Sequence, residues 1–345
     1  MSQHASRRYV IVGAGAVGGT VGGALARSGV DVVLVARGEH ARVLAEKGLT
    51  LRTPDDTYDI PVSAAGAPEE VRLTERDVLV FATKTHQLDA ALQDWADQPV
   101  YGGDDDVVGA AGELLPVFTA LNGVVAEEKA LRFFARVFGV CVWTPAAYVT
   151  PGEIIAKSWP VAAQFHIARW PAALATDEDR VLLEDIAKAW TPAGILVKLP
   201  PDAAPWKYNK LLTNLSNAVV ALTGSARDGE VATAVIREGE QVLARAGIGY
   251  VPFEVSKAAR AEGPTVRPVA GTGSVIPNST WQSLARNSGS VETDFLNGEI
   301  ARIARCYGGA APLNATLARL ARDAARSGRG PGGFSEAELA ELLGL

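Results

Sequence analysis

Short apolar runs alternate with longer amphipathic segments along the first 200 residues of the chain. The runs that predict buried strands are Tyr9 to Val12, Asp31 to Val35, Asp77 to Phe81, Val117 to Ala120, Gly139 to Trp143 and, closing the series, Ile195 to Leu199. Strands that alternate with helices usually pair in parallel, because each helix carries the chain back to the same end of the sheet. The pattern therefore predicts an α/β domain built on a parallel sheet that helices cover.

The pattern changes at Pro200, where three prolines within six residues form a stiff connection. The amphipathic segments beyond it predict helices over Trp206 to Thr223, Glu230 to Ala246, Phe253 to Ala261, Ser290 to Cys306 and Pro312 to Arg326. Ser335 and Glu338 have the spacing of a capping box, which predicts a short last helix ending at Leu343. Since 345 residues exceed the usual size of a single core, we expect two domains, residues 1–201 with the sheet and residues 202–345 all helical.

A glycine-rich turn follows the first strand, with Gly13, Gly15 and Gly18 in the spacing G-x-G-x-x-G. The first glycine permits a tight turn, the second lets the backbone approach a pyrophosphate, and the third allows close packing of helix on strand. The start of the following helix supplies N–H groups and the positive end of its dipole. The turn predicts a Rossmann-type dinucleotide site whose contacts are Gly13, Ala14, Gly15, Ala16, Val17 and Gly18. A turn without a ligand is the alternative, but a strand precedes this turn and the segment Thr20 to Ser28 predicts a helix after it.

The end of the second predicted strand indicates which dinucleotide binds. NAD sites usually place an acidic residue there to accept a hydrogen bond from the ribose 2′-hydroxyl. Ala36 and Arg37 stand in that place, and a guanidinium group can pair with the 2′-phosphate of NADPH. We therefore predict NADPH, held by Arg37 with Arg42 as a second partner. The alternative is that Arg37 is an ordinary solvated residue.

Composition limits the class of partner. The formal net charge of −6 argues against nucleic acid or an anionic membrane surface. No run approaches the roughly 18 to 20 apolar residues of a membrane span. The two cysteines have no metal-ligand spacing and imply no disulfide framework, so a cytoplasmic location is expected. The carboxylates Asp104 to Asp106 lie in a glycine-rich loop typical of a solvated surface, and we expect no metal.

Polar residues repeat along the predicted helix that begins near Trp206. Trp206, Lys210, Asn214 and Asn217 share one face, beside an apolar stripe that contains Leu211 and Leu215. A cation and two amides are a poor core stripe, because their burial without partners costs several kcal/mol. The row therefore either faces solvent or lines a polar cleft.

Five motifs in order make the chain resemble the ketopantoate reductase (2-dehydropantoate 2-reductase) family over nearly its whole length. They are the glycine turn, Lys84-Thr85-His86-Gln87, Leu121-Asn122-Gly123, Lys210 to Asn214, and Ser279-Thr280 together with Glu292 to Gly298. The resemblance implies a Rossmann domain and an all-helical domain like the C-terminal domain of 6-phosphogluconate dehydrogenase, flanking a cleft. The resemblance leaves open whether the protein forms a homodimer.

In that family, NADPH reduces the small 2-keto acid ketopantoate to pantoate for pantothenate biosynthesis. The resemblance implies that Lys210 is the general acid and that Glu292 binds the substrate and orients the lysine. Lys84, Gln87 and Asn122 are implied at the cofactor. The implied substrate contacts are Lys84, Asn122, Lys210, Asn214, Asn217, Ser279, Thr280 and Glu292.

One departure from the family pattern bears on the substrate. The family usually has a second asparagine eight residues after the lysine, where this chain has Ala218, with Asn217 one position earlier. A shift of one residue turns the amide by about 100° around a helix. This shift makes a reductase of another branched or natural-product keto acid an alternative. A non-catalytic NADPH-binding sensor is a separate alternative, of another class.

Overall fold

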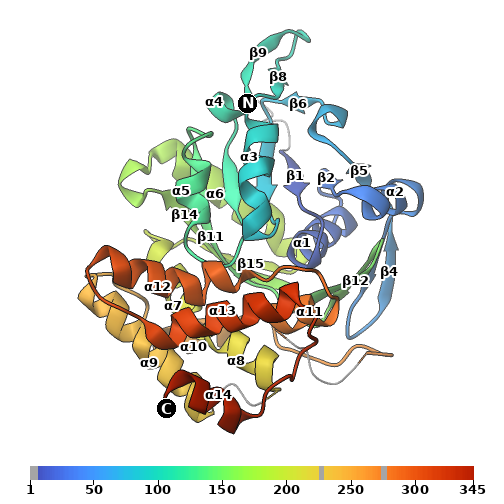
Figure 1. The fold of residues 1–345 in the computed structure, drawn as a ribbon. Coiled ribbons are helices and arrows are strands. Elements are labelled where there is room, and N and C mark those ends of the chain that lie inside the picture. Colours follow the sequence, from blue (N-terminus) through green and yellow to red (C-terminus); the bar gives the residue numbers. More distant parts are fainter. Residues whose placement is uncertain (1–6, 225–228, 273–277) are drawn as a thin grey trace. The chain divides into compact units, whose positions relative to one another are not determined.

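The computed structural model describes residues 7–224, 229–272 and 278–345, and these residues form two compact units (Figure 1). The first unit comprises Met1–Leu121, Val125–Ala203 and Glu254–Ile276, as far as these stretches are described. The second comprises Asn122–Val124, Ala204–Phe253 and Pro277–Leu345, with the same restriction.

The stretch that begins at Glu254 groups with the first unit, although the sequence-based division places it in the helical domain. Its contacts give the reason. The Gln164 side-chain amide donates to the Ala259 carbonyl at 2.9 Å, and Lys198 pairs with Glu262 at 2.6 Å. The chain thus runs from the second unit to the first and back again.

The first unit is built on an eight-stranded sheet in the order β15-β14-β11-β10-β7-β1-β2-β5. The strands are β1 (Arg8–Val12), β2 (Val32–Val35), β5 (Ser63–Ala65), β7 (Asp77–Phe81), β10 (Val117–Thr119), β11 (Val137–Trp143), β14 (Ala163–Trp170) and β15 (Ile195–Lys198). The six predicted strands are all present, and the last of them lies at an edge. The six strands from β11 to β5 in this order are parallel, whereas β14 and its parallel neighbour β15 run in the opposite direction. The predicted α/β domain with a largely parallel sheet is confirmed, and the antiparallel edge was not predicted; there, two strands replace a helical crossover between β11 and β14.

Those two strands, β12 (Ala146–Thr150) and β13 (Glu153–Ala156), belong to a second sheet in the order β12-β13-β3-β4, completed by β3 (Leu49–Arg52) and β4 (Thr57–Ile60). Helix α1 (Ala16–Arg27) contacts both sheets. Two adjacent glycines permit this: a Cβ on Gly22 would lie 2.3 Å from Leu34 of the large sheet, and one on Gly23 would lie 2.6 Å from Leu49 of the small one. Glycine costs about 0.5 to 1 kcal/mol in a helix, and here it permits close packing on both sides.

The remaining elements of the first unit cover the large sheet or extend from it. They are α2 (Gly38–Lys47), α3 (Leu88–Ala96), α4 (Ala111–Leu114), α5 (Ala126–Ala130), α6 (Asp177–Trp190), α10 (Phe253–Ala261) and the small sheet β6 (Leu73–Thr74), β8 (Pro99–Tyr101) and β9 (Val107–Ala110). Buried apolar clusters lie on both faces of the large sheet, as expected for a covered parallel sheet.

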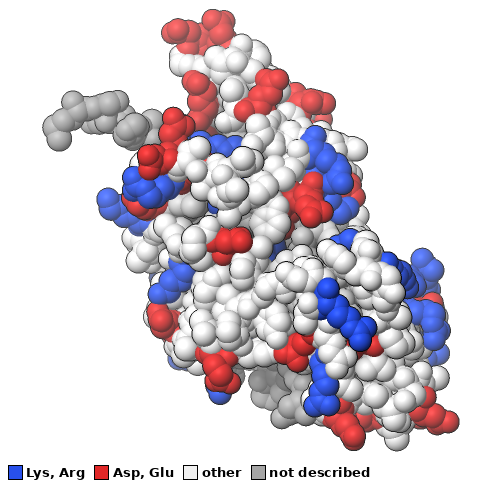
Figure 2. Space-filling model, turned by 90° about the vertical axis from the view of Figure 1, so that its left-hand side faces the viewer, with Lys and Arg blue, Asp and Glu red and all other residues white. Residues whose placement is uncertain are grey.

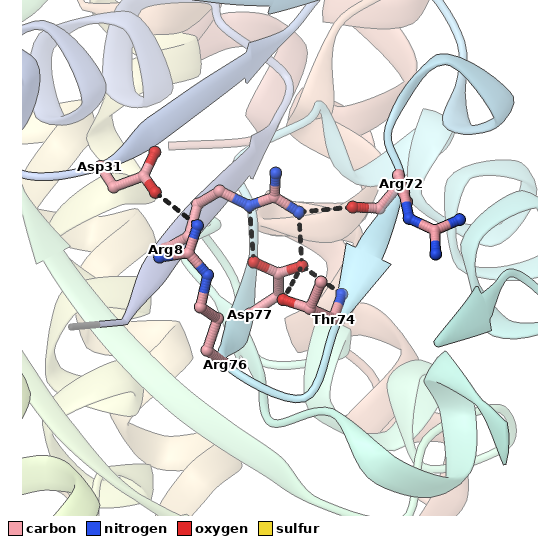
Figure 3. A network of polar contacts seen from close by, with 6 residues as sticks. All are labelled: Arg8, Asp31, Arg72, Thr74, Arg76 and Asp77. Carbon is pink, nitrogen blue, oxygen red and sulfur yellow. Dashed lines mark hydrogen bonds and ion pairs between the residues drawn. The ribbon is translucent and has the colours of Figure 1, made fainter. Parts of the chain in front are cut away.

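A buried ion pair joins two neighbouring strands at the amino-terminal ends of the large sheet's parallel strands (Figure 3). Arg8 and Asp77 begin the neighbouring strands β1 and β7, and the Arg8 Nε and Nη2 atoms donate to Asp77 at 2.7 and 2.6 Å. The Asp77 side chain is fully buried and also accepts from the Thr74 N–H at 2.7 Å. Hydrogen bonding to Asp77 raises the pKa of Arg8 above its ordinary value. The pair therefore lies at the opposite end of the strands from their carboxyl ends, where α/β proteins bind ligands.

The second unit is helical around one apolar core. Its elements are α7 (Ala204–Asn214), α8 (Ser216–Thr223), α9 (Glu230–Arg245), α11 (Ser279–Ala285), the 3-10 turn η5 (Glu292–Phe295), α12 (Asn297–Cys306), α13 (Pro312–Arg326) and α14 (Glu336–Leu343). The capping box of Ser335 and Glu338 is confirmed. Two predicted helices are wrong in detail, because Trp206 to Thr223 is broken at Leu215 and Ser290 to Cys306 divides into η5 and α12.

The surface carries both signs of charge. In the view of Figure 2, acidic and basic side chains of the described residues are interspersed. Some form local pairs on one helix, such as Arg42 with Glu39 and Arg180 with Glu184. In the described ranges, none of the helices is both long and apolar enough to cross a bilayer.

Candidate functional site

The glycine turn adopts the geometry that its spacing predicts. Gly13 follows β1 with φ of +102°, and a Cβ there would lie 2.9 Å from the backbone nitrogen of Thr83. A Cβ on Gly18 would lie 2.2 Å from the Gly13 carbonyl oxygen. These two positions therefore accept only glycine without rearrangement, the first for conformation and the second for space.

Gly15 differs from both, because it faces open space. Gly15 is the residue before α1 and has a φ of −74°. A Cβ on Gly15 would meet no heavy atom within 4 Å. Among the described residues, no side chain caps α1, so the first-turn N–H groups at Ala16 and Val17 lack a capping acceptor. Open space beside an uncapped helix start fits a phosphate group.

The N–H groups earlier in the turn are not available to a phosphate, because they bond to the protein backbone. The N–H groups of Gly13 and Ala14 both donate to the Val35 carbonyl, at 3.0 and 2.9 Å. They tie the turn to the end of β2. Their contribution to a phosphate site is thus to shape the turn, and the N–H groups at the uncapped start of α1 are left as donors for a phosphate.

The predicted 2′-phosphate partners separate in the structure. Arg37 is exposed at the position that precedes α2, directly after β2, and forms no ion pair with any described residue. Arg42 is instead engaged by two carboxylates of its own helix, Glu39 at 2.6 Å and Glu46 at 2.5 Å. Arg42 is therefore a poor second partner, and Arg37 remains the available guanidinium group.

The motif after the third predicted strand lies at the carboxyl end of β7. Lys84 precedes the 3-10 turn η2 (Thr85–Gln87), which leads directly into α3, and both Lys84 and Gln87 are half-buried. Asn122 follows β10, but its segment Asn122–Val124 groups with the second unit. There, a Cβ on Gly123 would lie 3.0 Å from the Phe295 carbonyl, so this segment packs on the 3-10 turn that carries Glu292.

The predicted substrate residues of the second unit lie on elements that contact one another. Lys210 and Asn214 are half-buried on α7, and Asn217 is buried on α8. Ser279 and Thr280 begin α11, which the Asn278 side chain caps by accepting from the Trp281 N–H at 2.9 Å. The same asparagine donates to the Asn217 carbonyl at 3.1 Å and so joins the start of α11 to α8.

The break at Leu215 changes the predicted polar row. Lys210 and Asn214 share a face of α7, whereas Asn217 lies on the next helix, so the row from Trp206 to Asn217 is not continuous. The buried Leu215 carbonyl at the break accepts from the Asn297 side chain at 3.0 Å. The Oδ1 atom of Asn217 is buried and accepts no hydrogen bond from any described residue.

Sequence reasoning missed three residues that shape these sites. His40 is buried and contacts Ala14 of the glycine turn, Asn278 joins α11 to α8, and Asn297 satisfies the break at Leu215. Each partner lies 26 to 82 residues away in the chain. Only the two asparagines had a local signal, since Asn278 adjoins the motif Ser279-Thr280 and Asn297 lies within the motif Glu292 to Gly298.

Comparison with known proteins finds two family models. The model described as "Ketopantoate reductase PanE/ApbA" matches residues 9–170, and "Ketopantoate reductase PanE/ApbA C terminal" matches residues 202–325. A curated relative, a 2-dehydropantoate 2-reductase of Pyrococcus horikoshii, is 25% identical over 321 residues, which cover 90% of this chain and 95% of that protein.

Two solved structures are similar over almost all of their length. A PanE/ApbA family ketopantoate reductase from Ralstonia eutropha has 26% identity and a TM-score of 0.73, covering 93% of this chain and 99% of that one. A D-mandelate dehydrogenase, solved with NADH and anilino(oxo)acetate, has 21% identity and a TM-score of 0.75 with the same coverage. The second likeness concerns the fold alone.

Proposed function

Because the chain belongs to the ketopantoate reductase family, we propose that this oxidoreductase reduces 2-dehydropantoate to pantoate with NADPH. The observation that carries the proposal is that Lys210 and Asn214 share a face of α7, while α11, which carries Thr280, packs on the following helix α8. The glycine turn of the first unit supplies the cofactor site. Together these residues provide what the reduction of a keto acid requires.

The chain's own residues would act on the carbonyl oxygen of the substrate. Bound NADPH supplies the hydride for the carbonyl carbon. Negative charge then develops on the oxygen, and the Lys210 ammonium group donates the proton that this oxygen takes up. Glu292 binds the substrate and orients the lysine. Amide and hydroxyl groups, with a second cation, hold the substrate carboxylate and hydroxyl: Lys84, Asn122, Asn214, Asn217, Ser279 and Thr280.

The choice of NADPH rests on Arg37. The chain has no carboxylate at the end of β2, where Ala36 is buried and Arg37 is exposed. An exposed guanidinium group without an ion-pair partner among the described residues is available to a 2′-phosphate. The D-mandelate dehydrogenase of similar fold was solved with NADH, so the two cofactors must be compared directly.

A second candidate function is the reduction of a different 2-keto acid, and Asn217 is the observation that favours it. Its buried Oδ1 accepts no hydrogen bond from a described residue, and Ala218 stands where the family usually has its second asparagine. A substrate with a differently placed donor would suit this arrangement. A non-catalytic NADPH sensor is the remaining alternative, and it would have no use for a proton donor at Lys210.

The test follows NADPH oxidation by the purified chain with 2-dehydropantoate and a panel of branched and aromatic 2-keto acids. We expect 2-dehydropantoate to have the highest kcat/KM. Lys210→Ala should lower kcat by about 10²-fold or more. Lys257→Ala, an exposed lysine of α10, is the matched control and should change nothing. A better keto acid would select the second candidate, and no turnover of any substrate would favour the sensor.

A further inference from the structure

We propose that His40 is a positioning residue for the cofactor, because it fixes the direction of the Gly15 N–H group in the phosphate-binding turn. This inference rests on the proposed use of that turn by NADPH. His40 lies in the first turn of α2 and is 9% exposed. It links the glycine turn to the connection between β12 and β13, two segments far apart in the chain.

The hydrogen bonds of His40 define its tautomer. The Gly152 N–H donates to Nδ1 at 2.9 Å, and Nε2 lies 2.8 Å from the Ala14 carbonyl oxygen. A backbone N–H can only donate, so Nδ1 is the acceptor and Nε2 carries the hydrogen. Nε2 therefore donates to Ala14. Burial lowers the pKa of His40, which favours this neutral form, and the Tyr148 ring packs edge-on at 4.9 Å between centroids.

The bond to Ala14 acts on Gly15 through the peptide between them. The Ala14 carbonyl and the Gly15 N–H belong to one planar trans peptide and point in opposite directions. Since His40 holds the carbonyl on its own side, the N–H must point away from His40. Gly15 has no neighbour within 4 Å of its Cβ position and has the freedom of glycine, so without this bond the peptide could rotate at low cost.

The other turn residues do not impose the same restraint. The N–H groups of Gly13 and Ala14 are fixed by the Val35 carbonyl, but these bonds lie on the preceding peptides. Among the described residues, His40 donates the one hydrogen bond to the Ala14 carbonyl from outside the turn and helix α1. A donor that is already oriented loses less conformational entropy when an anion binds, which strengthens binding.

Two substitutions separate the two hydrogen bonds of the imidazole. His40→Gln places an amide nitrogen near the position of Nε2 and retains a donor for Ala14. His40→Asn places an amide oxygen near the position of Nδ1, so it retains an acceptor for Gly152 and loses the donor. Both side chains are polar, and neither is larger than histidine. Thermal unfolding of each variant checks that it is folded.

The experiment measures the Kd of NADPH and of ADP-ribose, which has the pyrophosphate but lacks nicotinamide. We expect His40→Asn to raise both Kd values about five- to tenfold, in keeping with one lost hydrogen bond. His40→Gln should stay within about twofold of the wild type. In steady-state assays, the KM for NADPH should rise in His40→Asn while kcat at saturating NADPH is unchanged, a separation that general destabilisation would not produce.

Equal Kd values in the wild type and His40→Asn would overturn the inference and leave the proposed function intact. Equal losses in both folded variants would assign the effect to packing of the ring and would also overturn it. If the wild type binds neither nucleotide, the proposed function fails, and the inference fails with it.

Discussion

A Cβ atom on Gly18 would lie 2.2 Å from the carbonyl oxygen of Gly13, whereas one on Gly15 would meet nothing within 4 Å. Two glycines of one motif thus serve different ends. Gly18 allows α1 to pack against the turn, and Gly15 leaves room for a ligand. The distinction can be measured, because stability and nucleotide affinity should respond to different substitutions.

Gly18→Ala should destabilise the first unit by about 1 to 3 kcal/mol, because the added methyl group forces the helix away from the backbone of the turn. Gly15→Ala should leave the free energy of unfolding within about 1 kcal/mol of the wild type, since its φ of −74° suits alanine. It should nevertheless weaken NADPH binding at least about tenfold, because the methyl group occupies the space for the pyrophosphate. Urea unfolding and NADPH titration measure the two effects, and wild-type affinity in Gly15→Ala would exclude this phosphate site.

Arg37→Ala should weaken NADPH binding and leave NADH binding unchanged. Removing a charge-assisted hydrogen bond to phosphate costs about 1.5 to 3 kcal/mol, which corresponds to roughly ten- to hundredfold in Kd. Arg42→Ala is the control, since Glu39 and Glu46 already engage that side chain. Titration of each variant with both nucleotides gives the result. Equal affinity of the wild type for NADPH and NADH would contradict the role given to Arg37.

Asp77→Asn should lower the free energy of unfolding by about 3 kcal/mol, because it leaves Arg8 beside a neutral group at a buried edge. Asp77 is fully buried and receives bonds from Arg8 and from the Thr74 N–H. Glu184→Gln breaks an exposed pair with Arg180 and should cost less than about 1 kcal/mol. Chemical denaturation compares the two. NADPH affinity should be unchanged in Asp77→Asn, because the pair lies at the edge opposite the glycine turn.

The sequence predicted those elements whose signals are local. The glycine turn, the six strands and the capping box at Ser335 depend on residues within a few positions of one another. Strand β14 was missed because Gln164, His166 and Arg169 interrupt its apolar pattern. Their polar groups become acceptable in the core only through distant partners, such as the Ala259 carbonyl for Gln164 and the Val137 carbonyl for Arg169.

The site shows the same limit. The positions of Lys210 and Asn214 on one helix follow from their spacing of four residues. The break at Leu215 does not, because its buried carbonyl is satisfied by Asn297, 82 residues later. His40 likewise has no sequence signal, since its partners Ala14 and Gly152 are 26 and 112 residues away.

Asn297→Leu should destabilise the second unit by about 2 kcal/mol, because the Leu215 carbonyl and Asn314 Oδ1 would both lose a buried donor. Asn297 is fully buried, and its Nδ2 also donates to Asn314 Oδ1 at 2.9 Å. Arg305→Ala on the exposed face of the same helix is the control and should stay within about 0.5 kcal/mol. Urea unfolding measures both variants. If Asn297→Leu lowers the free energy of unfolding no more than the control does, the hydrogen bond to Leu215 does not stabilise the break between α7 and α8.

Stability should fall in mild acid because of His166. This histidine lies in β14 at 2% exposure, and its pKa is lowered to about 4, chiefly by burial and further by the charge of Lys198, with Glu262 opposing. The folded state then binds a proton less readily than the unfolded chain, whose histidines titrate near 6.5. Stability from the neutral ring is complete above pH 6.5, declines as the pH falls, and is fully lost below about pH 4.

The size of this effect follows from the lowered pKa. The difference between the ordinary value of 6.5 and a folded value of about 4 corresponds to about 3 kcal/mol. His166→Gln removes the titrating ring but keeps a polar side chain of similar length. Urea unfolding of both proteins between pH 8 and pH 4.5 should show a difference in unfolding free energy that is constant above pH 7 and shifts in favour of the variant below pH 6.5. Parallel stability curves over this range would mean that His166 is protonated in the folded protein as easily as in the unfolded chain.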